Sequence, residues 1–255
     1  MAFGLPEYYQ RLGGTVHIGE RDLTTGTLAA TGLTFLGDAS ELTFETSQEF
    51  VEHMEHQSGD GKKDVKIPRM TTINGNLILD NTGSQNFKTF IRGTLATDTG
   101  ASVSAEAHTA PAAGSSFLLT KPIVNAVTSI TSDPTGTTFV AGDDYVVDGR
   151  LIYVPEGSAM AGDPILVNYT SGDSTEASFF GENFKEYYLF FQGYNTINKK
   201  RVSLDFYKVS FDAASLGNLL GDEIIQMTCP FEALFEPLQS TAGNLAGYGN
   251  YVLAD

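Results

Sequence analysis

The stretch Glu41-Leu-Thr-Phe-Glu-Thr-Ser-Gln-Glu-Phe-Val-Glu-His-Met54 decides the fold that this sequence predicts. Apolar side chains recur along it at even positions, namely Leu42, Phe44, Phe50 and Met54. Acidic and imidazole side chains recur at odd positions, namely Glu41, Glu45, Glu49, His53 and Glu55. Because successive side chains of a strand point to opposite faces, this alternation predicts a strand with one core-facing and one acidic face.

A second alternating stretch, Asp64 to Leu79, follows the polar loop His56-Gln-Ser-Gly-Asp-Gly-Lys-Lys63. Its apolar residues are predicted to share one face, and they are Val65, Ile67, Ile73, Leu77 and Leu79. Two such segments joined by a polar loop predict a long antiparallel hairpin from Glu41 to Asp80. A two-stranded hairpin is marginal in water by itself, so this one needs further strands from its own chain or from neighbouring subunits.

A second long hairpin is predicted farther along the chain. Tyr187 to Tyr194 is apolar at consecutive positions, as in a strand covered on both faces, and Arg201 to Phe211 returns with an alternating pattern. The polar residues between these segments form the turn. A last strand, broken by Pro230, is predicted for Glu223 to Phe235.

One amphipathic helix is predicted after the first hairpin. Ser84 is a suitable N-cap residue, and the apolar stripe consists of Phe87, Phe90, Ile91 and Leu95. The polar residues between these positions place the helix on the surface, with the apolar stripe against a sheet.

The domain organisation predicted from composition is a body with an inserted module. The body comprises residues 1–98 and 178–255, including an N-terminal arm and a C-terminal arm that docks elsewhere. Residues 99–116 are rich in Ala, Ser, Thr and Gly, which predicts a linker. Residues 117–173 alternate short strands with turn signals such as Asp148-Gly149, which predicts a small inserted β domain.

Composition and charge exclude several classes of function. The chain has 255 residues and a net charge of −16, which argues against a groove that binds nucleic acid by neutralising phosphates. The lone Cys229 excludes an internal disulfide, and no secretory leader opens the sequence. No run reaches the about 20 apolar residues of a membrane helix. We therefore expect a soluble protein made in a reducing cytosol, with no membrane partner.

The sequence contains no recognisable catalytic motif, which predicts that the protein is not an enzyme and has no cofactor. No G-x-S-x-G, phosphate-loop, H-E-x-x-H or C-x-x-C motif occurs. In His53-Met-Glu-His56 the two histidines are three apart, so on a strand they point to opposite faces and do not converge on a metal. Turn chemistry accounts better than calcium binding for the acids of the module, which are Asp133, Asp143, Asp144, Asp148 and Asp163.

The order of these elements resembles that of the tail tube (major tail) proteins of long-tailed bacteriophages. The resemblance rests on Glu41-Leu-Thr-Phe-Glu45, Leu77-Ile-Leu-Asp80, the helix from Ser84-Gln-Asn-Phe87 to Gly93, Leu189-Phe-Phe-Gln-Gly-Tyr-Asn195 and the return strand Arg201 to Val209. The segment from Gly142-Asp-Asp-Tyr145 to Tyr169 is similar to a module found inside several such proteins. The resemblance covers most of the chain as a pattern and includes no catalytic motif.

The resemblance implies a mainly β fold, a barrel-forming β-sandwich with one flanking helix and a small inserted all-β domain. It implies self-assembly into stacked hexameric rings that form the tail tube, the channel for DNA delivery. The other implied partners are tape measure protein and DNA inside the lumen, and tail terminator and distal tail proteins at the ends. The implied location is the virion tail, after assembly in the host cytoplasm.

Two sets of site residues follow from this resemblance. The candidate lumen-lining residues are Glu41, Glu45 and Glu49, whose carboxylates would repel DNA phosphates. A rival assignment places strand 187–194 beside the lumen. The candidate inter-ring loop includes His56, Asp60, Lys62 and Lys63.

Other functions remain open at this stage. An inner tube protein of a contractile tail or a related injection machine would share the fold, although a sheath would leave little room for an outward module. An extracellular module that binds glycan or a cell surface through the insert is a different class. A hydrolase on a β scaffold is disfavoured by the motif search.

Overall fold

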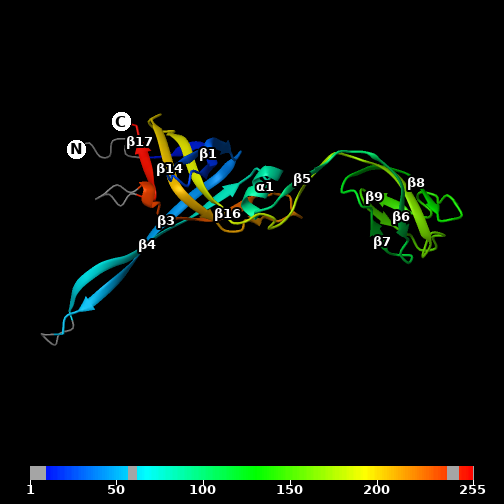
Figure 1. Cartoon of the computed structure of the whole chain (residues 1–255), viewed down its shortest axis with the longest axis horizontal. Helices are drawn as coiled ribbons and strands as arrows, with labels where there is room; N and C mark the ends of the chain where they lie inside the picture. The colour runs from blue at the N-terminus through cyan, green and yellow to red at the C-terminus, as the bar shows by residue number, and fades with distance from the viewer. Residues whose placement is uncertain (1–9, 57–61, 240–246, 255) are drawn as a thin grey trace. The chain divides into compact units, whose positions relative to one another are not determined.

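The computed structural model describes residues 10–56, 62–239 and 247–254 (Figure 1). The fold is mainly β, with several antiparallel sheets and one α-helix among these residues, which confirms the predicted fold class. The chain divides into two compact units. Unit 1 comprises residues 1–94 and 178–255, and unit 2 comprises residues 95–177.

Unit 1 is built on one antiparallel sheet with the strand order β2-β1-β13-β14-β16-β4-β3, in which β15 pairs with β16 and β17 pairs with β14. The strands are β1 (Leu12–Arg21), β2 (Leu28–Phe35), β3 (Ala39–Met54), β4 (Lys63–Leu79), β13 (Glu186–Asn195), β14 (Arg201–Phe211), β15 (Ser215–Leu216), β16 (Met227–Ala233) and β17 (Gly249–Leu253). Both predicted long hairpins are therefore confirmed. The hairpin β13-β14 lies inside the sheet and the hairpin β3-β4 at one end of it.

The core of unit 1 lies on one face of this sheet. Leu77, Leu189 and Val209 are almost fully buried there. The sheet curls around the core, since the ring of Phe44 on β3 lies 5.5 Å from that of Phe206 on β14, measured between centroids. Burying each such side chain contributes about 1.5–3 kcal/mol, which holds the curled sheet together.

The helix α1 (Ser84–Ile91) covers part of this core through Phe90, whose ring centroid lies 4.9 Å from that of Phe211. Two details of the helix prediction are wrong. The N-cap is Gly83 rather than Ser84, and no side chain caps the first turn. Arg92 adopts a left-handed conformation with φ 55°, which turns the chain out of the helix, so Leu95 begins a strand instead of extending the stripe.

Pro230 does not break the last strand, contrary to the sequence prediction, although the strand begins at Met227 rather than Glu223. Pro230 pairs with Asn76 of β4, and its carbonyl accepts from the amide of Asp212 on the other side. The nitrogen and oxygen of one strand residue point to the same side. The missing N–H of Pro230 therefore faces away from β4, and the ladder between β16 and β4 loses no hydrogen bond.

The C-terminal arm docks on its own chain rather than elsewhere, as far as it is described. Gly249–Leu253 forms β17 and pairs with residues 202–206 of β14. The short 3-10 helix η2 (Pro237–Gln239) precedes it. At the other end of the chain, Leu12 to Gly14 belong to β1 and not to an arm.

Unit 2 is a small β structure with its own core. Its strands are β5 (Leu95–Asp98), β6 (Ser102–Thr109), β7 (Ser116–Leu118), β8 (Val124–Ser132), β9 (Val146–Asp148), β10 (Leu151–Tyr153), β11 (Pro164–Ser171) and β12 (Ser174–Ala177). They form the sheets β6-β11-β8 and β7-β10-β9 and the pair β5-β12. Ile130, Ile152 and Val167 are fully buried in the core. The predicted hairpin at Asp148-Gly149 is confirmed as β9-β10.

The predicted linker at residues 99–116 is wrong, and the inserted unit is longer than the predicted 117–173. Residues 102–109 form β6, which pairs with β11 along most of its length. Only Val103 of this strand is a large apolar residue, and it packs against the core. The small side chains around it give no hydrophobic period, so the strand is recognisable only through its pairing with β11.

Candidate self-assembly hairpin

The hairpin β3-β4 extends well beyond the sheet that supports its base. β4 pairs with β16 only from Ile73 to Leu79, whereas β3 and β4 pair with each other as far as Met54 and Lys63. We call residues 49–54 and 63–70 the distal ribbon; all of them are exposed. Figure 1 shows this two-stranded ribbon leaving the rest of unit 1. Within the described residues, no third strand supports it.

The base of the hairpin has the two faces that the sequence predicts. Leu42 pairs with Leu77, and both contribute to the core. Glu41, Glu45 and Glu49 lie on the opposite face and are exposed. Residues four apart on a strand are separated by roughly 13 Å, so these carboxylates form a widely spaced acidic stripe. Its assignment to a lumen stays a prediction.

A β-bulge changes the faces of the distal ribbon. Glu49 pairs with Met70, but the next residue, Phe50, pairs with Pro68, so β4 has one extra residue, Arg69. The extra residue shifts the alternation of β4 by one position. Ile67 therefore pairs with Val51 and lies on the same side as the glutamates. The prediction that one apolar face runs from residue 65 to residue 79 is wrong for this reason.

The two faces of the distal ribbon differ in how well they are covered. On one face, the Lys66 ammonium lies 3.8 Å from the Phe50 ring centroid and Lys63 lies 2.5 Å from the Glu52 carboxylate. The hydrogen bond from Lys63 lowers the pKa of Glu52. On the other face, the exposed fractions of Val51, Val65 and Ile67 are 53%, 42% and 56%. This second face is an apolar patch without a partner in the described chain.

The residues of the candidate inter-ring loop are only partly described. The amide of Glu55 donates to the carbonyl of Lys62 over 2.7 Å, which continues the hairpin to its loop. His56, Lys62 and Lys63 lie at this end of the hairpin, while Asp60 lies outside the described residues. His53 Nδ1 is 2.8 Å from the Asp64 carboxylate, and its hydrogen bond lowers the pKa of Asp64.

No metal centre or membrane helix is found in the described part of the chain. No group of three or more His, Cys, Asp and Glu side chains among the described residues is arranged to hold a metal ion. No described helix is long and apolar enough to span a bilayer.

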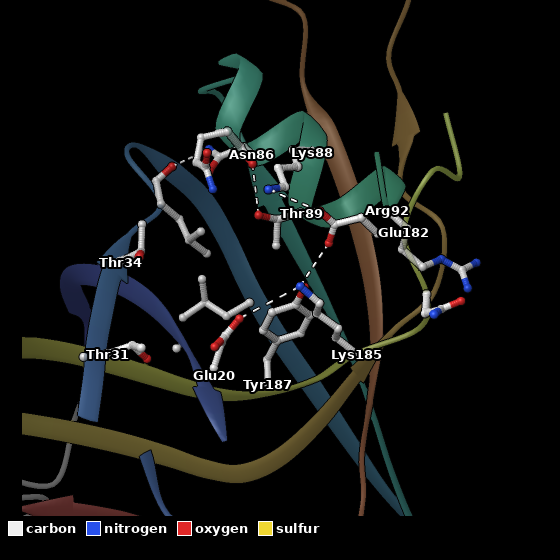
Figure 2. A pocket seen from close by; sticks show the side chains of 16 residues that line it. Glu20, Thr31, Thr34, Asn86, Lys88, Thr89, Arg92, Glu182, Lys185 and Tyr187 are labelled. Atoms are coloured by element: carbon white, nitrogen blue, oxygen red, sulfur yellow. Dashed lines mark hydrogen bonds and ion pairs between the residues drawn. The ribbon is translucent and has the colours of Figure 1, made fainter. Parts of the chain in front are cut away.

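A polar cavity of about 280 Å³ lies between α1 and strands β1 and β2 (Figure 2). Figure 2 shows Lys88 and Lys185 converging on Glu182, at 3.2 and 3.0 Å. The amides of Phe180 and Glu182 donate to the carbonyls of Ile91 and Arg92 just above. Because Lys88 and Lys185 both pair with Glu182, these contacts attach residues 178–187 to the helix.

Unit 2 contains a carboxylate network that the sequence analysis missed. Glu106 accepts hydrogen bonds from the Tyr169 hydroxyl, from His108 and from both the amide and the hydroxyl of Thr120. Burial raises the pKa of Glu106, but these hydrogen bonds together outweigh burial and lower it to about 2. The network joins β6, β11 and the β7-β8 loop, so its role is structural. No motif marks it, because Thr120 and Tyr169 are distant from Glu106 in sequence.

Comparison with known proteins gives one family match. The family model described as "Protein of unknown function UCP028589" matches residues 9–252. This range includes all of unit 2, most of unit 1 and the whole hairpin β3-β4. A comparison with curated proteins finds no match.

Proposed function

The chain belongs to this family of unknown function, and from its structure we propose that it is a structural virion protein that forms a phage tail tube. Its copies assemble into stacked hexameric rings, and the resulting channel delivers DNA into the host. The long hairpin β3-β4 provides the main contact between subunits. The protein acts through assembly and passage, and performs no catalysis.

The observation that carries this proposal is the unsupported distal ribbon. A two-stranded ribbon gains too little from its own pairing to be stable in water. This ribbon also exposes apolar side chains on both faces, including Phe50, Val51 and Ile67. Burying the exposed half of each against a neighbour contributes on the order of 1 kcal/mol per side chain. Association with other copies therefore supplies the core that the ribbon lacks.

The edges of the unit 1 sheet support the same proposal. Among the described strands, β2 and β3 are the end strands, so each has one unpaired edge. Such edges are templates for pairing with another chain, and closing strands into a ring removes them. Closing the sheets of neighbouring copies into a ring pairs these edges, and contact with further copies covers the distal ribbon.

The acidic stripe accounts for passage of DNA. In a closed ring, the face that carries Glu41, Glu45 and Glu49 lines the lumen, and its carboxylates repel DNA phosphates. DNA and tape measure protein contact this wall only transiently. Tail terminator and distal tail proteins bind the two ends of the tube, and the mature protein resides in the virion tail.

Negative-stain electron microscopy of the purified full chain tests the proposal. We expect tubes or six-fold rings. The variant Ile67→Lys should stay monomeric with an unchanged melting temperature, since Ile67 is exposed in the single chain. The variant Asp148→Lys, on an exposed position of unit 2, is the matched control and should assemble. A wild-type chain that remains monomeric at high concentration would rule out the tube.

One observation favours a second candidate function, a module that binds glycan or a cell surface. The outer face of the sheet β7-β10-β9 in unit 2 exposes four side chains, Leu118, Val146, Leu151 and Tyr153. An exposed aromatic ring beside apolar side chains is a common platform for a sugar face. Binding of the full chain to a glycan array, lost in Tyr153→Ala, would support this function. Absence of binding to the array would rule out this function for unit 2.

A further inference from the structure

The loop between β15 and β16, residues 217–226, is a second unpartnered surface of unit 1. Its apolar side chains are unusually exposed, at 66% for Leu219, 93% for Leu220 and 79% for Ile224. The loop also carries Asp222 and Glu223 and contains no Lys or Arg. It surrounds a hollow of about 490 Å³. Exposed apolar residues combined with uncompensated negative charge indicate a docking surface for a partner of apolar and basic character.

The distal ribbon offers apolar side chains and one cation that complement this surface. Its unpartnered face presents Val51, Val65 and Ile67. Arg69, the extra residue of the bulge, is two residues from Ile67 on the same strand. The ribbon carries three cations, of which Lys63 pairs with Glu52 and Lys66 lies over the Phe50 ring on the opposite face. Arg69 is therefore the cation that we assign to the contact with a partner.

The geometry of β4 prevents these two surfaces from meeting within one copy. Met227 pairs with Leu79, and β16 runs antiparallel to β4, so the residues that precede Met227 lie beyond the Leu79 end of β4. The side chain of Gln226 confirms this placement, because it donates to the Asp80 carboxylate over 2.8 Å. Ile67 lies twelve residues away along the same strand, which corresponds to roughly 40 Å. The two surfaces therefore lie at opposite ends of β4.

We propose that the distal ribbon of one copy docks on loop 217–226 of the next copy. Val51, Val65 and Ile67 pack against Leu219, Leu220 and Ile224, and Arg69 lies beside Asp222 and Glu223. Because the contact joins opposite ends of the subunit, it is head-to-tail, and we propose that it repeats from one ring to the next along the tube. The inference rests on the proposed tube and specifies the surface that receives the hairpin.

Paired cysteines test this contact directly. The full-length double variant Ile67→Cys with Leu220→Cys should, after assembly and oxidation, give a ladder of covalent oligomers on a non-reducing gel. Each single variant should give no ladder. The native Cys229 does not interfere, since it is fully buried and burial raises the pKa of its thiol to about 12.

The outcomes of this experiment separate the inference from the proposed function. Tubes that form without a ladder would overturn the docking site and leave the tube intact. A wild-type chain that forms no tubes or rings would overturn both. Covalent dimers in the single variant Ile67→Cys would show ribbon-to-ribbon packing, and would also overturn the docking site.

Charge reversal provides an independent test with a built-in rescue. Arg69→Glu alone, or Asp222→Lys with Glu223→Lys, should raise the critical concentration for assembly by about tenfold. Combining all three substitutions should restore it toward the wild-type value. Asp148→Lys is again the control and should leave it unchanged. Additive loss in the combined variant would contradict the pairing of these charges.

Discussion

Insertion of a single residue should impair the assembly of this protein without changing the stability of the single chain. The bulge at Arg69 places Val65 and Ile67 on the glutamate side of the hairpin, where Val51 also lies. A threonine inserted between Glu49 and Phe50 would pair with Arg69 and restore regular alternation. The side chains of residues 50–54 and 63–68 would then change face, while the base of the hairpin would keep its register.

The expected magnitude follows from the exposure of the three apolar side chains. About half of each remains to be buried, at 53%, 42% and 56%, so losing their contacts costs roughly 1 kcal/mol each. The sum, about 3 kcal/mol, corresponds to roughly a hundredfold increase in the critical concentration. The melting temperature of the single chain should change little, because these residues are exposed there.

Pelleting over a concentration series measures the critical concentration, and circular dichroism measures the melting temperature. Deletion of Arg69 is the matched control. It also removes the bulge, but it leaves Val51 and Ile67 on their original face. It should therefore raise the critical concentration by no more than the tenfold expected for the lost charge. An insertion variant that assembles at the wild-type concentration would refute the role of this apolar face.

Three further predictions concern other parts of the chain. The acidic stripe consists of Glu41, Glu45 and Glu49. Replacing all three with lysine should permit tube assembly but impair DNA delivery. Unchanged infectivity would count against a lumen position for these residues. The pKa of Glu106 is about 2 in the folded chain and about 4.5 in the unfolded chain. Ionised Glu106 therefore stabilises unit 2 by roughly 3 kcal/mol above pH 4.5. This stabilisation is lost as the pH falls toward 2. Glu106→Gln should therefore lower the melting temperature of unit 2 at pH 7 and flatten its dependence on acid, as measured by calorimetry. Replacing residues 95–177 with a short Gly-Ser turn should leave unit 1 folded, because the hydroxyls of Thr94 and Ser178 are only 2.7 Å apart; loss of the unit 1 circular dichroism signal would contradict this independence.

Local patterns were sufficient for much of the fold. Alternation predicted both long hairpins, because one buried face requires every second residue to be apolar. The Asp148-Gly149 pair predicted the hairpin β9-β10, because Gly149 supplies the positive φ of the turn, 57°. The acidic face at the base of β3 could also be predicted, since those residues keep a strict period of two.

The features that the sequence did not predict share a different cause. The strand β6 lacks large apolar residues, so only its pairing with β11 identifies it. Pro230 remains inside a strand because its missing N–H points away from β4. The network around Glu106 joins residues that are distant along the chain. In each case the deciding interaction is with a partner strand, which no local window contains.

The sequence by itself determined that this protein has a long hairpin with one acidic face, since that conclusion needs only the period of side chains along a strand. Tertiary structure alone decided on which face of the distal ribbon Val65 and Ile67 lie. The alternation of β4 is read correctly from sequence only if every residue is paired, and the bulge at Arg69 leaves one residue out. Pairing between strands, rather than the period within one strand, therefore sets the surface that the hairpin offers to another copy.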